Sequence, residues 1–120
     1  LLSVTKTPGT VEDIALDETG QMALIADYRA GLLLLDISDL SHPRILGNYD
    51  GMDLAVAVAY SQDKAWVADY KQGLVVIDIS DPQNPRRDHA EDTGKTNDIK
   101  IYNGYAFCAC QEGLLSFSLN

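Results

Sequence analysis

Short apolar runs alternate with polar turns along the whole chain. The runs are rich in Ala, Val, Ile and Leu, last only a few residues, and end at clusters of Asp, Asn, Ser, Gly or Pro. This spacing is typical of β-strands joined by tight turns, and it is too short for amphipathic helices. The pattern predicts strands over residues 1–7, 13–16, 22–26, 32–37, 44–49, 54–58, 65–68, 74–79, 86–91, 98–101, 105–109 and 114–119.

The chain repeats itself with a period of 42 residues. Residues 68–81 align with residues 26–39, and nine of these fourteen positions are identical. A fixed period of about 40 residues built from short β-rich runs indicates a propeller blade or another β array. We therefore predict an all-β fold made of propeller blades, each with four antiparallel strands.

The strand count gives about three blades. Residues 10–51 and 52–94 each form a complete blade, and residues 95–120 form the first three strands of another. Residues 1–9 supply the last strand of a preceding or closing blade, because at the 42-residue offset residues 1–7 lie over 44–49. Since propellers typically have about four to eight blades, we expect either a partial propeller completed by further blades or half of a six-bladed ring completed by a second copy.

The composition excludes some classes of binding partner but does not define a function. The formal net charge of −9 argues against nucleic acid, whose phosphates would be repelled. No apolar run reaches the roughly 18 residues of a transmembrane segment. Because the chain does not begin with Met, we expect it to start inside a longer natural sequence or after a removed segment.

The two cysteines, Cys108 and Cys110, are two residues apart in a predicted strand. Their Cα atoms would lie about 6.5–7 Å apart, at or beyond disulfide reach. We predict two small, buried, apolar side chains without a bridge. A metal site is the alternative, but the sequence offers no second Cys or His pair nearby to complete it.

The repeated segment resembles the LVIVD repeat of bacterial and archaeal secreted or surface propellers. The resemblance is carried by Ala-Asp, then Gly-Leu, an apolar run and Asp-Ile-Ser-Asp-Pro, which is complete over residues 68–82. It implies a β-propeller, an extracellular, cell-surface or periplasmic location, and an adhesive or scaffolding role without a catalytic motif or cofactor. The third unit departs from the pattern, because Cys110 and Ser118 replace two repeated aspartates.

The repeated polar residues are predicted to be structural. A short carboxylate before a turn can accept backbone N–H bonds and fix that turn. A cation-binding role is the alternative for these aspartates. The predicted structural turn residues are Asp27, Asp69, Asp36, Asp78, Gly31, Gly73 and Gly113.

Two further aspartates are candidates for a metal site. Asp13 and Asp98 begin first strands, which line the central channel of a propeller, and Ala55 takes their place in the second unit. Acidic side chains there could bind a cation such as Ca²⁺ or a basic segment of a partner, or could hydrogen-bond to the loop of a neighbouring blade. His89 and Glu91 are a second possible metal pair, although a solvent-facing outer strand explains them equally well.

Two hypotheses of function follow. The first is a non-enzymatic scaffold or protein-interaction module of an exported or cell-surface protein. The second is part of a propeller enzyme, a hydrolase or lyase, with a cation at the channel mouth. The sequence shows neither a serine nucleophile elbow nor a phosphate-binding glycine loop.

Overall fold

Residues 1–119, which the computed structural model describes, form eleven strands in three antiparallel sheets. The first sheet contains β1 (Asp13–Leu16), β2 (Met22–Ala26), β3 (Leu32–Asp36) and β4 (Arg44–Tyr49). The second contains β5 (Ala55–Ser61), β6 (Lys64–Asp69), β7 (Gly73–Asp78) and β8 (Arg86–Glu91). The third contains β9 (Thr96–Tyr102), β10 (Tyr105–Cys110) and β11 (Gly113–Ser118).

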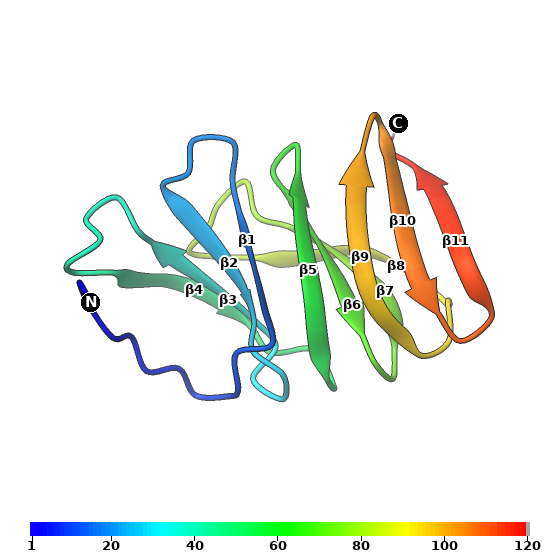
Figure 1. Cartoon of the computed structure of the whole chain (residues 1–120), viewed down its shortest axis with the longest axis horizontal. Helices are drawn as coiled ribbons and strands as arrows, with labels where there is room; N and C mark the ends of the chain where they lie inside the picture. The colour runs from blue at the N-terminus through cyan, green and yellow to red at the C-terminus, as the bar shows by residue number, and fades with distance from the viewer. Residues whose placement is uncertain (120) are drawn as a thin grey trace.

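The three sheets follow one another along the long axis of the molecule (Figure 1). In each sheet neighbouring strands are consecutive in sequence, and the first strands β1, β5 and β9 lie next to one another. Stacked sheets with a shared row of first strands are the arrangement of propeller blades. The predicted all-β propeller class is confirmed.

Both faces of the central strands are buried. In β3 the four consecutive leucines are at most 6% exposed, and β7 is equally buried. One apolar cluster joins the first sheet to the second, and another joins the second to the third. The leucine run therefore belongs to a strand with cover on both sides, as the sequence predicted.

Strand pairing fixes which residues of the three units are equivalent. In the inner strand pairs Asp13 faces Ala26, Ala57 faces Ala68, and Asp98 faces Ala109. Ala57, and not Ala55, thus takes the place of the two aspartates in the second unit. The assignment from sequence was wrong because the turn after β5 is two residues shorter than the turn after β1. Leu16 faces Ala23, whereas Tyr60 faces Ala65, so the 42-residue offset of the second strands becomes 44 residues in the first strands.

The strand predicted over residues 1–7 is not formed within this chain. The segment is extended and runs beside the first sheet, at the opposite end of the molecule from β11 (Figure 1). A β-strand needs the amide and carbonyl groups of a neighbouring strand, and no third strand of a blade lies beside these residues in the described chain. No helix in the described residues is long and apolar enough to cross a membrane.

Replacement of Leu34 by Ala tests the packing between the first two sheets. Leu34 is fully buried in the cluster that joins them. We expect Leu34→Ala to lower the free energy of unfolding by about 2–5 kcal/mol, measured by urea denaturation. The control Leu40→Ala removes a 55% exposed side chain and should change stability by less than about 0.5 kcal/mol. Equal stability of the two variants would contradict this packing.

Candidate functional site

The most elaborate polar site in the chain surrounds Asp69, which is fully buried at the end of β6. Its Oδ2 accepts hydrogen bonds from the amides of Asp53 and Leu54, at 2.8 and 3.1 Å. Its Oδ1 accepts hydrogen bonds from the amides of Lys71 and Gln72, at 2.8 and 2.9 Å. One carboxylate thus fixes the β6–β7 turn and also holds the linker that enters the blade from the preceding one. We call this arrangement the acidic clasp.

Asp27 holds the linker of the first unit as Asp69 holds that of the second. It is fully buried, its Oδ1 accepts a hydrogen bond from the Thr7 hydroxyl at 2.7 Å, and its Oδ2 accepts one from the Gly9 amide at 3.0 Å. Gly9 therefore takes the place that Asp53 has in the second unit, which is an offset of 44 residues. The 42-residue offset used for the N-terminal segment was wrong by two residues, which is the difference in length between the β1–β2 and β5–β6 turns.

The third unit lacks the carboxylate. Cys110 stands in its place, and its thiol donates to the Gly113 carbonyl at 3.3 Å. The linker is held by two buried hydroxyl groups, since Thr93 and Thr96 hydrogen-bond to each other.

Asp13 connects two blades. Its Oδ1 accepts a hydrogen bond from the Ile14 amide at 2.9 Å, and its Oδ2 accepts one from the Val58 amide of β5 at 3.0 Å. Asp98 makes the same local contact, since its Oδ1 accepts from the Ile99 amide at 2.9 Å. For Asp98 Oδ2, the described part of the chain shows no corresponding amide donor.

The two candidate metal ligands are not brought together. Asp13 lies on β1 and Asp98 on β9, with β5 between them (Figure 1). Within residues 1–119, no three His, Cys, Asp or Glu side chains are grouped so that they could hold a metal ion. His89 pairs with Asp88 at 2.9 Å, so its ring nitrogen is directed to its sequence neighbour.

Asp36 and Asp78 fix the turns that follow the third strands. Asp36 Oδ1 accepts the amide and the hydroxyl of Ser38, at 2.9 and 2.7 Å, and Asp78 binds Ser80 at the same distances. These hydrogen bonds, together with Arg44, lower the pKa of Asp36 to about 2. The pKa of Asp78 is lowered by its bonds to Ser80.

Three glycines in the turns before the third strands differ in what surrounds them. Gly31, Gly73 and Gly113 all have a positive φ, which favours glycine. A side chain at Gly31 would collide with the carbonyl of Tyr49, and one at Gly73 would meet the carbonyl of Glu91. These carbonyls end β4 and β8, so a fourth strand passes over each of the two glycines. Gly113 has open space instead.

The two outer faces of the stack expose apolar residues that are buried elsewhere in the repeat. Leu114 is 73% exposed at a position where Leu32 and Leu74 are fully buried. At the other end Ile14 is 57% exposed, whereas the equivalent residues Val58 and Ile99 are 4% and 1% exposed. At the equivalent positions inside the stack, a neighbouring blade covers the side chain. Leu114 and Ile14 have no such neighbour in the described chain.

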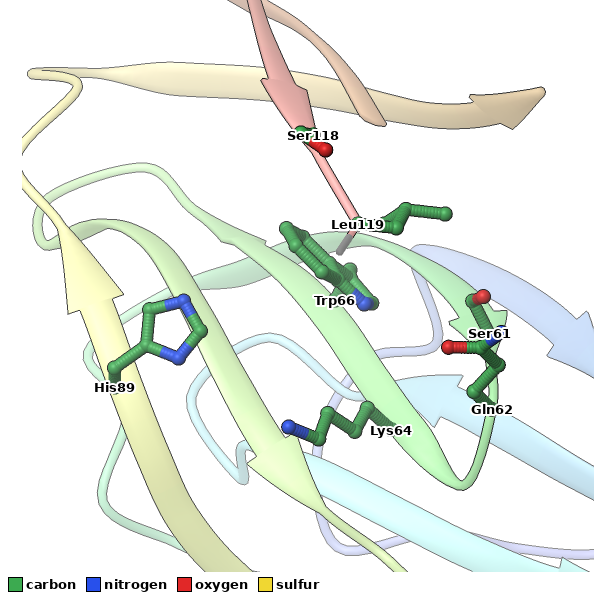
Figure 2. Close-up of a pocket in the computed structure, with 7 residues that line it drawn as sticks. All are labelled: Ser61, Gln62, Lys64, Trp66, His89, Ser118 and Leu119. Carbon is green, nitrogen blue, oxygen red and sulfur yellow. The ribbon is translucent and has the colours of Figure 1, made fainter. Parts of the chain in front are cut away.

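A hollow of about 270 Å³ lies between the second sheet and the end of β11 (Figure 2). It is lined by Ser61, Gln62, Lys64, Trp66, His89, Ser118 and Leu119. The rings of Trp66 and His89 meet edge to face at 6.2 Å, and hydrogen bonds from Lys64 and His89 lower the pKa of Asp88. In the preceding unit Gly47 takes the place of His89 and is covered by Pro82 of the next blade. The equivalent position in the preceding unit is covered by the next blade, so the hollow is a place where the packing between the second and third sheets is incomplete.

Sequence reasoning missed one contact between blades. Tyr28 has a positive φ, and it exchanges two backbone hydrogen bonds of 3.0 Å with Ala55 at the start of β5. Aromatic residues rarely adopt this conformation, so a tyrosine in a turn gives no signal for it.

Cys108 and Cys110 are both free, and their environments differ. Cys108 is fully buried against the second sheet, and burial raises the pKa of its thiol to about 11. Cys110 is half-exposed, so the prediction of two buried side chains was wrong for this residue. It lies at the end of β10, beside an irregularity in the pairing with β9, where the neighbouring sheet does not cover it.

These features define the class of the protein, a set of β-propeller blades, and solved structures share the fold. A gluconolactonase from Xanthomonas campestris superposes with a TM-score of 0.71 at 12% identity, over 98% of this chain and 40% of that chain. A chain from a complex of Dbp5, Nup159, Gle1, IP6 and ADP from S. cerevisiae gives 0.66 at 12% identity, over 95% and 32%. The computationally designed Ika4 protein gives 0.54 at 11% identity, over 98% and 96%.

The family is shown by the sequence itself. The LVIVD repeat profile matches residues 8–51, 54–87 and 93–116, and the chain belongs to the LVIVD repeat family. No curated protein matches this sequence. The chain spans less than half the length of the first two solved structures, whose likeness at this identity concerns the fold alone.

Removal of the Asp69 carboxylate tests the acidic clasp. Asp69→Ala leaves four amides without their acceptor inside a buried site, so we expect a loss of about 3 kcal/mol or more in the free energy of unfolding. Asp53→Ala is the matched control, because the exposed Asp53 carboxylate accepts a hydrogen bond from the side chain of Gln72. It should cost less than about 1 kcal/mol. Similar losses in the two variants would mean that Asp69 does not hold the linker.

The thiols should differ in reactivity. We expect iodoacetamide at pH 8 to alkylate Cys110 well before Cys108, because Cys108 is buried and has a raised pKa. Peptide mapping by mass spectrometry measures the order of modification, and both thiols should react at similar rates in urea. Early modification of Cys108 in the folded protein would contradict its burial against the second sheet.

Proposed function

We propose that this chain is a non-enzymatic β-propeller scaffold and protein-interaction module of an exported or cell-surface protein. The observation that carries the proposal is the use of the repeated carboxylates. Asp27 and Asp69 hold linkers, Asp36 and Asp78 hold turns, and Asp13 joins two blades. The side chains that could perform acid–base or cation chemistry are thus engaged in keeping the blades rigid.

The open end faces support an interaction role. Apolar residues such as Ile14 and Leu114 are exposed at the two ends of the stack, and exposed apolar surfaces mark sites of association, here with further blades or with a second copy. The proposed location outside the cytoplasm follows from the secreted and surface propellers that the repeat resembles.

The alternative, a hydrolase or lyase with a cation at the channel mouth, requires Asp13 and Asp98 to act as ligands. Asp13 already uses both of its oxygens on amides, and one of these amides belongs to the next blade. A cation there would have to displace the Val58 amide and loosen the contact between the first two blades.

A combined activity and binding assay tests the proposal. We expect no turnover of glucono-lactone, nitrophenyl esters or uronate oligosaccharides, with or without Ca²⁺, and no binding of Ca²⁺ in titration calorimetry. Turnover that is lost in Asp13→Asn or Asp98→Asn, but retained in the control Asp53→Asn, would overturn the non-enzymatic assignment.

A further inference from the structure

We propose that Asn103 is a site of spontaneous covalent modification, at which the side-chain amide is lost and the link to Gly104 becomes isoaspartate. The site is the turn between β9 and β10. The reaction needs only water, and its product weakens the packing of the third sheet. The inference goes beyond the proposed scaffold role, because it concerns a chemical change within a blade.

The reaction uses the peptide nitrogen of the residue that follows an asparagine. The Gly104 nitrogen forms a bond to Cγ of Asn103, and its proton passes through solvent to the side-chain nitrogen, which leaves as ammonia. Water then opens the succinimide ring at one of its two carbonyls and gives aspartate or isoaspartate. Glycine favours the attack because it has no Cβ to crowd its nitrogen. The sequence contains a single Asn-Gly pair, at residues 103 and 104.

The β9–β10 turn presents both reacting groups to solvent. Tyr102 faces Tyr105, so Asn103 and Gly104 form a two-residue hairpin turn, with φ of 54° and 82°. Asn103 is exposed, and a Cβ added at Gly104 would meet nothing within 4 Å. Within residues 1–119 the Asn103 side chain makes no hydrogen bond. Water and base therefore reach the site without an opening of the blade.

The equivalent turn in the second sheet shows that this exposure does not depend on a missing neighbour. Gln62 and Asp63 take the places of Asn103 and Gly104 between the facing ends of a first and a second strand. They also have positive φ, and both are exposed, although the second sheet packs against a sheet on each side. The tip of such a turn thus remains in solvent when a blade packs beside it.

The attacking nitrogen lacks a contact that its equivalent in the second sheet makes. The amide of Asp63 donates to the hydroxyl of Tyr60 at 3.2 Å. Ile101 takes the place of Tyr60 in β9, so the Gly104 amide has no hydroxyl beside it. In the described chain that amide has no other acceptor. No hydrogen bond therefore has to break before the nitrogen attacks.

The other asparagines within residues 1–119 are less suited to the reaction. The Nδ2 of Asn48 donates to the carbonyls of Ala30 and Leu32, at 3.1 and 3.2 Å. Asn84 precedes a proline, whose nitrogen has no proton to lose. Asn97 is exposed, but it lies within β9 and precedes an aspartate, whose side chain crowds the nitrogen. Reaction at Asn103 should therefore come first.

Isoaspartate changes the backbone as well as the charge. The chain then passes through the former side-chain carbon, so the turn becomes one backbone atom longer. Loop length sets the register of a hairpin, and the longer turn no longer matches the pairing of Tyr102 with Tyr105. β10 also carries Cys108, which is buried against the second sheet. The modification should therefore loosen the contact between the second and third sheets.

Peptide mapping of aged protein tests the site. Protein kept at pH 8 should contain isoaspartate at residue 103, detected by mass spectrometry and by labelling with protein isoaspartate methyltransferase. Asn48 and Asn97 are internal references and should remain intact over the same time. Suppose that residue 103 stays intact in the folded protein but reacts in urea. The turn would then protect the residue, and the inference would be overturned.

Two substitutions copied from the second sheet are matched controls. Asn103→Gln copies Gln62 and keeps an amide, but its longer side chain does not form the five-membered ring, so isoaspartate should disappear. Gly104→Asp copies Asp63 and should slow the reaction about tenfold or more, because a side chain then crowds the nitrogen. Both variants should keep the far-UV circular dichroism of the parent chain. Undiminished conversion in Gly104→Asp would overturn the route through the Gly104 nitrogen.

The reactivity of Cys108 tests the effect on the fold. The isoaspartate form has one more negative charge than the parent chain and is separated from it by anion exchange. Its Cys108 should react with iodoacetamide severalfold faster than Cys108 of the unmodified protein, because the third sheet opens more often. Asn103→Asp is the control, since it has the same charge on an unchanged backbone. Equal Cys108 rates in these two forms would overturn the loosening of the sheet.

Discussion

The central strands of the first two sheets are apolar on both faces, and this constraint governs the rest of the structure. A sheet of this kind is stable only between two other layers, since each face removes apolar surface from water when it is covered. The middle sheet satisfies the requirement within the chain, and its central strands are completely buried. The outer face of the first sheet buries Ala23, Ile25, Leu33 and Leu35 and leaves residues of β1 such as Ile14 exposed. The third sheet leaves Leu114 exposed on its outer face.

Because the blades are buried to this extent, their polar residues are needed to hydrogen-bond buried backbone groups. The inner ends of the blades contain turns and linkers whose amides lie away from water, and an unpaired buried amide is costly. A short carboxylate can accept several N–H groups at once, so one Asp at the end of β6 satisfies four of them. The aspartate of the repeat is therefore a device for joining consecutive blades, and its charge is balanced by backbone dipoles.

Much of this architecture is predictable from the chain itself. The periodicity of the apolar runs and the match between residues 26–39 and 68–81 indicate the blades, the strand order and the turns fixed by Asp36 and Asp78. The difference in length between the β1–β2 and β5–β6 turns was missed, because the match between residues 26–39 and 68–81 fixes the offset only from the second strand onward. That difference shifted the equivalence of Ala57 and of the N-terminal residues by two positions. The absence of a strand over residues 1–7 depends on a neighbour far away in space, which local sequence cannot reveal.

The replacement of the clasp aspartate by Cys110 affects the order in which the three sheets unfold locally. In a linear array of repeats, each unit contributes its own stability and that of its contacts with its neighbours. In the third sheet, Cys110 replaces the carboxylate of the other units, and two hydroxyl groups hold the linker. Its local opening therefore requires less free energy than that of the first two sheets. Thermal fluctuations that expose backbone amides begin at β9–β11 and travel toward the middle sheet, which exchanges its amide hydrogens last.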